Sequence, residues 1–169
     1  MLKHTFSVLV ENRFGVLARV AGLFSGRGYN IDSLVVSPTE NKNFSRMTVV
    51  THGDSAILEQ IQKQLSKLVE VVQVTDLTGS GYVSRELMLL KVKANEKTRS
   101  EVIQMTGVFK GNVVNVQKES LIVEMTGSSE KLDAFEELMS GYGIIELART
   151  GKVALSRASE TTEFYEADE

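Results

Sequence analysis

The chain has 169 residues, of which 42% are hydrophobic, and carries a formal net charge of −3 at pH 7. This length and hydrophobic content suffice for one domain or two small ones with packed cores. The acidic balance argues against nonspecific binding to nucleic acid and against attachment to anionic lipid. The sequence contains no cysteine, which excludes disulfides, thiolate catalysis and cysteine-ligated zinc or iron–sulfur sites.

The amino-terminal segment "MLKHTFSVLVEN" alternates like a strand. It has neither the apolar core of a signal peptide nor the arginine- and serine-rich composition of a transit segment. The sequence also has no run of about 18 apolar residues that would span a membrane. We therefore expect a cytoplasmic, prokaryotic protein that has no membrane partner.

The first half of the chain has the order strand, helix, strand, strand, helix, strand, which predicts a ferredoxin-like βαββαβ unit over residues 1–78. Glycines after the first helix and an N-cap aspartate before the second, Asp54, mark the helix ends. The expected elements are strands at 4–10, 29–39, 44–52 and 69–77, and helices at 15–24 and after Asp54.

A glycine- and serine-rich stretch, "TGSGYVS", interrupts this pattern, and we place a linker at 79–83. The same order then returns over 84–157, as strands at 85–94, 112–117, 120–127 and 143–150 and helices at 100–109 and 129–139. The fold class is therefore α+β, with two tandem ferredoxin-like units. Residues 158–169 are acidic and poor in apolar residues, and we expect a mobile tail.

Apolar residues occupy both faces of the hairpin formed by the second and third strands. Leu34, Val36, Met47 and Val49 alternate with Val35, Ser37, Thr48 and Val50. A βαββαβ unit covers only one face of its sheet with helices, so the other face needs a second cover. A partner subunit that makes a homodimer and the second unit of the same chain are both open explanations.

The loop in "ENRFGVLARV" carries no nucleophile, yet it places a glycine where a helix begins. A helix that starts near Gly15 leaves the amides of Gly15, Val16 and Leu17 without intrahelical partners, at the positive end of the helix dipole. Asn12 adds a carboxamide that can accept from an ammonium group or donate to a carboxylate. These groups suit a small zwitterion, although Asn12 and Gly15 are also ordinary turn and cap residues.

Asn30 follows the same helix, at the start of the second strand. It therefore lies at the opposite end of the helix from Asn12, and one chain cannot easily bring both residues to one ligand. A symmetric dimer can do so. The other interpretation of Asn30 is a simple turn residue.

His4 and His52 fall on neighbouring antiparallel strands, but two imidazoles without a third ligand are a weak metal signal. We find no Ser/His/Asp arrangement, no paired carboxylates in a known motif and no phosphate-binding glycine loop. An RNA-recognition module needs exposed stacking aromatics with basic neighbours on its central strands, whereas these strands offer Phe6 and Phe44 amid few charges. The sequence thus predicts neither an enzyme nor a nucleic-acid-binding protein.

At this point the segments "GLFSGRGYNIDSL" and "SRMTVVT", followed by "RELMLLKV", "FKGNVVNV" and "ELARTG", carry a resemblance. The chain closely resembles the regulatory (small) subunit of acetohydroxyacid synthase, also called acetolactate synthase, and its first unit resembles the ACT domain of that family. The resemblance implies a subunit of branched-chain amino acid biosynthesis without its own active site. It implies that such a subunit activates a large catalytic subunit, a transferase, and confers feedback inhibition by valine. Thiamine diphosphate, magnesium and FAD are implied on the catalytic partner and no cofactor on this chain.

The resemblance also implies that two ACT domains pair through their sheets and bind the effector at the dimer interface. The matching positions are Asn12, Phe14, Gly15, Val16 and Leu17 in the loop of one chain, with Asn30 and Ile31 of the other. Phe14 departs from the family, in which proline or a small residue usually precedes the glycine. A bulky ring here changes the wall of the pocket, so the choice among valine, leucine and isoleucine is open.

Two other classes of function remain as alternatives. A free-standing ACT module could sense an amino acid and regulate another enzyme or a transcription complex. A metal-responsive protein could use His4 and His52, and would then carry stoichiometric metal.

Overall fold

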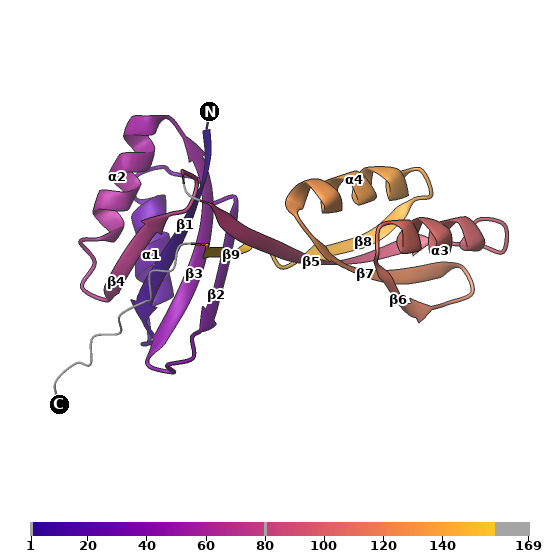
Figure 1. Cartoon of the computed structure of the whole chain (residues 1–169), viewed down its shortest axis with the longest axis horizontal. Coiled ribbons are helices and arrows are strands. Elements are labelled where there is room, and N and C mark those ends of the chain that lie inside the picture. Colours follow the sequence, from indigo (N-terminus) through magenta and orange to yellow (C-terminus); the bar gives the residue numbers. More distant parts are fainter. Residues whose placement is uncertain (1, 80, 158–169) are drawn as a thin grey trace.

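A four-stranded sheet and a five-stranded sheet, each with two helices on one face, form the two ends of an elongated chain (Figure 1). The structure is a computed structural model that describes residues 2–79 and 81–157. The predicted α+β class with two βαββαβ-like units is confirmed. The predicted acidic tail, 158–169, lies outside the described residues.

The first sheet has the strand order β2-β3-β1-β4. Its elements are β1 (Leu2–Glu11), α1 (Val16–Ser25), β2 (Ser33–Pro38), β3 (Phe44–Gly53), α2 (Ser55–Leu65) and β4 (Val71–Asp76). Asp54 caps α2 as predicted, because its side chain accepts a hydrogen bond from the amide of Ile57 at 2.8 Å. Phe6, Val8 and Val49 on the sheet pack against apolar side chains of both helices to form the first core. The helix residues are Val20 and Phe24 of α1 and Leu58, Ile61 and Leu65 of α2.

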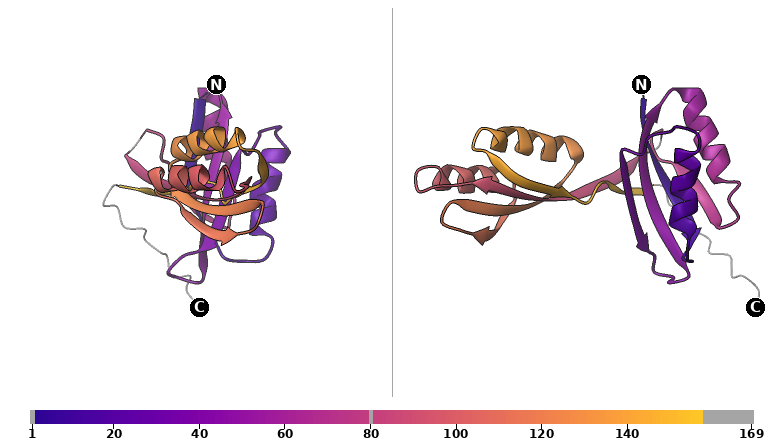
Figure 2. Two further views of the ribbon diagram at one scale, coloured as in Figure 1. Left: turned by 90° about the vertical axis from the view of Figure 1, so that its right-hand side faces the viewer. Right: turned by 180° about the vertical axis from the view of Figure 1, so that it is seen from behind.

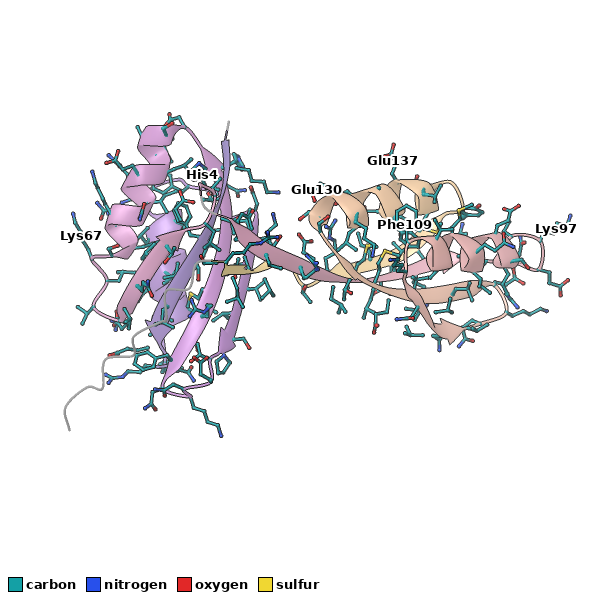
Figure 3. All side chains as sticks on the ribbon, in the orientation of Figure 1. His4, Lys67, Lys97, Phe109, Glu130 and Glu137 are labelled. Atoms are coloured by element: carbon teal, nitrogen blue, oxygen red, sulfur yellow. The ribbon has the colours of Figure 1, made fainter. Side chains whose placement is uncertain are left out.

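The second sheet has the order β6-β7-β5-β8, with β9 paired to the other end of β5. Its elements are β5 (Tyr82–Lys93), α3 (Arg99–Val108), β6 (Asn112–Val116), β7 (Ser120–Gly127), α4 (Ser129–Ser140), β8 (Ile144–Arg149) and β9 (Val153–Ser156). Phe109 and Phe135 meet in its core with ring centroids 5.2 Å apart, and Figure 3 shows Phe109 at the end of α3, on the side of α4.

The long strand β5 belongs to both ends of the molecule. Its first residues, Tyr82–Arg85, pair with β9, and its later residues pair with β7 and β8. The sequence analysis predicts no strand at β9. It also predicts that Tyr82 and Val83 lie in the linker 79–83, whereas in the structure both residues belong to β5. The division of the chain into domains at 79–83 stays a prediction.

The helices α1 and α2 cover the face of the first sheet that is turned away from the second unit, as Figure 2 shows in its right-hand view. On the other face, Thr48 and Val50 are only 3% and 1% exposed. There β9 crosses the sheet, and the amide of Ala154 donates to Thr48 Oγ1 at 3.4 Å. Over this part of the sheet, the second unit of the same chain therefore supplies the cover.

Within residues 2–79 and 81–157, none of the helices has the length and apolar composition that crossing a membrane requires.

Candidate functional site: the loop before helix α1

The loop that joins β1 to α1 presents backbone amides at the start of the helix. Gly15 is the N-cap residue with φ 84°, and no side chain caps the helix. Among the described residues, the amides of Gly15 and Leu17 have no hydrogen-bond partner, whereas the amide of Val16 donates to the carbonyl of Arg13 at 3.4 Å. The three amides have no partner within the helix, as predicted, but Val16 uses its amide in the turn with Arg13. Of the three, the amides of Gly15 and Leu17 are therefore the free donors for an anion.

Asn12 is held in place by the turn between β2 and β3. Its side-chain amide donates to the carbonyl of Lys42 at 2.9 Å, and its backbone amide donates to the carbonyl of Asn43 at 2.7 Å. The carboxamide oxygen of Asn12 accepts no hydrogen bond from the described residues. The carboxamide oxygen is therefore available to accept from a ligand ammonium group, and one of the two N–H donors of the side chain is already used.

A hollow of about 230 Å³ lies beside this loop, between α1 and the ends of β2 and β3. Its apolar lining includes Val16, Leu17, Val36 and Met47, and Asn12 stands at its polar side. Leu17 and Val36 are 43% and 40% exposed, although both are aliphatic. The hollow thus offers apolar contacts for a small branched side chain next to free amides and a carboxamide oxygen.

The structure brings only part of the predicted site together in one chain. Asn12, Val16 and Leu17 line the hollow, with Gly15 between them in the loop. The ring of Phe14 is fully exposed to solvent and does not line the hollow. The bulky ring at position 14 therefore does not narrow the hollow of the single chain.

Asn30 and Ile31 do not line the hollow, because they follow the far end of α1. Asn30 is exposed and donates to Asp32 Oδ1 at 2.8 Å, while its backbone carbonyl accepts from Thr51 Oγ1 at 2.6 Å. Ile31 is half-buried against the first core. A second chain is needed if these residues and Asn12 bind the same ligand.

The sequence reasoning missed the contribution of the β2–β3 hairpin to the hollow. Val36, Pro38 and Met47 line it, and the carbonyls of Lys42 and Asn43 orient Asn12. The signal was present in the strand pairing, because Glu11 at the end of β1 lies opposite Phe44 at the start of β3. An alignment of the two predicted strands would have placed the turn beside Asn12.

His4 and His52 do not converge on a common site. His4 Nδ1 lies 2.7 Å from Asp76 Oδ2, and His52 Nδ1 lies 2.9 Å from Asp32 Oδ1. Figure 3 shows His4 near the N-terminal end of β1, which is the end remote from the loop before α1. Within the described part of the chain, no group of three histidine, cysteine or acidic side chains could hold a metal ion.

The carboxyl group of Asp76, which contacts His4, has a lowered pKa in the folded chain. Burial raises the pKa of Asp76, but hydrogen bonds from Thr78 and His4 outweigh it and hold the pKa below its ordinary value. The folded state therefore favours the ionised form of the Asp76 carboxyl group.

The strand next to the hollow, β2, lies at an edge of its sheet. Among residues 2–79 and 81–157, β2 pairs only with β3, so its outer backbone groups are open to another strand. The fold defines a class of protein: an ACT-type βαββαβ domain joined to a second α+β unit.

Comparison with known proteins identifies the family. Residues 6–73 match the family described as "AHAS small subunit-like ACT domain", and residues 85–158 match "Small subunit of acetolactate synthase". The chain belongs to the acetolactate synthase small subunit family, as its resemblance predicted.

Relatives in this family match over almost the whole chain. The "Probable acetolactate synthase small subunit" of Archaeoglobus fulgidus is 51% identical over 94% of this chain and 99% of its own length. The "Acetolactate synthase small subunit" of Mycolicibacterium smegmatis is 49% identical over 91% of both chains. The crystal structure of the acetolactate synthase small subunit from Thermotoga maritima covers 95% of this chain and 100% of its own, with a TM-score of 0.85 and 39% identity.

Proposed function

We propose that this chain binds the large catalytic subunit of acetolactate synthase, raises its activity and makes it sensitive to inhibition by valine. The observation that carries the proposal is the free amide pair of Gly15 and Leu17 beside a small aliphatic hollow. Such a site can bind an amino acid without transforming it. Thiamine diphosphate, magnesium and FAD belong, in this proposal, to the catalytic partner.

The open edge of β2 supports a homodimer in which two sheets join side by side. In antiparallel pairing about a twofold axis, the C-terminal half of β2 in one protomer lies opposite the N-terminal half in the other. The hollow adjoins the C-terminal half, at Val36 and Pro38. Asn30 and Ile31 precede the N-terminal half, which begins at Ser33. This geometry brings the loop of one chain to the Asn30 segment of its partner.

Valine fits this composite site by its three chemical parts. Its carboxylate accepts from the amides of Gly15 and Leu17, where the helix dipole favours an anion. Its ammonium group donates to the carboxamide oxygens of Asn12 and of the partner's asparagine at position 30. Its isopropyl group contacts Leu17 and Val36, and Ile31 of the second chain completes the apolar wall.

Inhibition requires that valine have different affinities for two states of the complex with the catalytic subunit. A ligand shared between two protomers favours the state in which the two ACT domains are held together. The proposal is that this state supports less catalytic activity than the ligand-free one.

Calorimetry with valine, leucine and isoleucine at millimolar concentration tests the effector site directly. We expect valine to bind, and Asn12→Ala and Asn30→Ala each to weaken it. Asn115→Ala is the matched control, because Asn115 is an exposed asparagine on the second unit. No binding of any of the three amino acids by the unmodified chain would refute the effector site.

Mixing the two variants tests whether the site is shared between chains. In a heterodimer of Asn12→Ala and Asn30→Ala protomers, one composite site carries both substitutions and the other carries neither. After subunit exchange in an equimolar mixture, about a quarter of all sites should regain unmodified affinity. If both asparagines act within one chain, the mixture regains none.

A further inference from the structure

The connector between β8 and β9, Thr150–Lys152, touches the first residue of β2. Gly151 has φ +84°, and a Cβ built on it would collide with Ser33 Oγ and come within 3.2 Å of Val35 Cγ2. Next to it, the amide of Lys152 donates to Ser33 Oγ at 3.3 Å. Glycine is therefore required at position 151 for both its backbone conformation and the close approach of β2.

The same connector is fixed to the second unit at its other end. The amide of Thr150 donates to the carbonyl of Leu87 at 3.0 Å, and its hydroxyl accepts from the amide of Leu87 at 3.1 Å. Leu87 lies in β5, where this strand enters the second sheet. A single short segment thus joins the start of β2 to the base of the second unit.

A buried ion pair anchors this base to helix α4. Arg149 Nη2 lies 2.6 Å from Glu86 Oε2, and Glu86 is only 8% exposed. The hydroxyl of Ser129, at the start of α4, donates to Glu86 Oε1, and Arg149 Nη1 also binds Asp133 at 2.6 Å. These contacts hold β8 and α4 together, so a displacement of the connector moves both elements.

Between the two units the connector borders a hollow of about 380 Å³. Asp32 and Ser33 line one side of it, and Asp133 and Arg149 line the other. Protein cores are close-packed and resist deformation, whereas space at a junction lets the two sides change their separation. The junction can therefore move without compression of either core.

Ser33 stands close in sequence to the Asn30–Ile31 segment, and the intervening Asp32 is tied to β3 by a 2.8 Å hydrogen bond from its amide to the carbonyl of Val50. We propose that Ser33 and Gly151 are positioning residues through which an effector bound at the Asn30–Ile31 segment sets the orientation of the second unit. This inference rests on the proposed effector site. It assigns the coupling between the two halves of the chain to one contact.

Hydrogen exchange on the full chain, with and without saturating valine, tests this contact. Ser33→Ala removes the acceptor of the Lys152 amide without backbone strain. In the unmodified chain we expect valine to slow exchange about fivefold or more in peptides covering 12–17 and 30–34 and also 149–153. In Ser33→Ala the effect should persist at 12–17 and 30–34 but fall below about twofold at 149–153.

Gly151→Ala perturbs the same contact by steric repulsion, because the added Cβ forces Ser33 and the connector apart. Gly143→Ala is its control: Gly143 has φ +100°, but a Cβ there meets only the flexible side chain of Lys93. With the catalytic subunit present, we expect Gly151→Ala to keep its valine affinity within about threefold while losing at least half of the maximal inhibition. Gly143→Ala should keep both.

The outcomes separate this inference from the proposed function. If valine changes no exchange at 12–17 or 30–34 in the unmodified chain, the effector site itself is refuted, and the coupling with it. If those segments respond but Ser33→Ala retains the full response at 149–153, only the coupling is refuted. Should Gly151→Ala fail to fold, the Ser33→Ala result decides alone.

Discussion

Substitution of Gly15 by alanine separates the two reasons for glycine at the start of α1. Gly15 has φ +84°, and a Cβ built on it meets no atom within 4 Å in the single chain. Folding therefore loses only the conformational preference of an L residue, about 1 kcal/mol. The effect on ligand binding is larger, because the new methyl group stands where a carboxylate must approach the free amides.

The size of the binding effect follows from the hydrogen bonds at risk. The site offers the carboxylate the two unpartnered amides of Gly15 and Leu17. Loss of one hydrogen bond to a charged group costs about 1.5–3 kcal/mol, which corresponds to a rise in Kd of roughly 10- to 150-fold. We expect Gly15→Ala to weaken valine binding within this range.

Gly28→Ala provides the comparison, because Gly28 has φ +69° and equally open surroundings. Its amide already donates to the carbonyl of Ser25 at 3.1 Å, so it is not a free donor for a ligand. Urea denaturation should show a similar loss of stability in both variants, and calorimetry should show a large loss of affinity in Gly15→Ala alone. Equal affinities for the two variants would refute the role of the loop amides.

Three further predictions concern stability and assembly. Because the pKa of Asp76 is lowered in the folded chain, its ionised carboxylate stabilises the fold above its unfolded pKa. That contribution is lost as the pH falls through the folded pKa, so urea denaturation below about pH 4 should show a shallower decline in Asp76→Asn than in the unmodified chain; an unchanged slope would contradict this. Arg149→Met leaves the buried Glu86 without its cation and should lower the free energy of unfolding by about 3 kcal/mol. Asp133→Asn, at a side chain that is 63% exposed, should cost less than about 1 kcal/mol, and equal losses would show that burial of the pair is unimportant. Phe14→Ala should change the stability of the single chain by less than about 0.5 kcal/mol, because the ring is fully exposed. Its dimer dissociation constant in analytical ultracentrifugation should rise about tenfold; no change would place Phe14 outside the interface.

The sequence predicts the elements whose pattern is local. The apolar spacing of Val16, Val20 and Phe24 predicts α1, and Asp54 predicts the start of α2; the structure confirms both. The four-residue strand β9 lacks such a signal. Its partner is Tyr82–Arg85, some 70 positions earlier, so only the tertiary pairing identifies it.

The candidate site is predictable in its residues but less so in its contacts. Asn12, Val16 and Leu17, which the sequence singles out, line one hollow. The backbone contact from Val16 to Arg13 and the orientation of Asn12 by Lys42 depend on loop geometry that no spacing rule specifies. That Asn30 of a partner chain forms the second half of the site stays a prediction.

The central claim is that this chain regulates acetolactate synthase by binding valine. The most direct measurement is acetolactate formation by the purified large catalytic subunit, with and without this chain and with and without valine. The account predicts that the chain raises the activity and that valine then lowers it, with no effect of valine on the catalytic subunit alone. Activity that does not change when the chain is added, although the catalytic subunit is competent, would contradict the account.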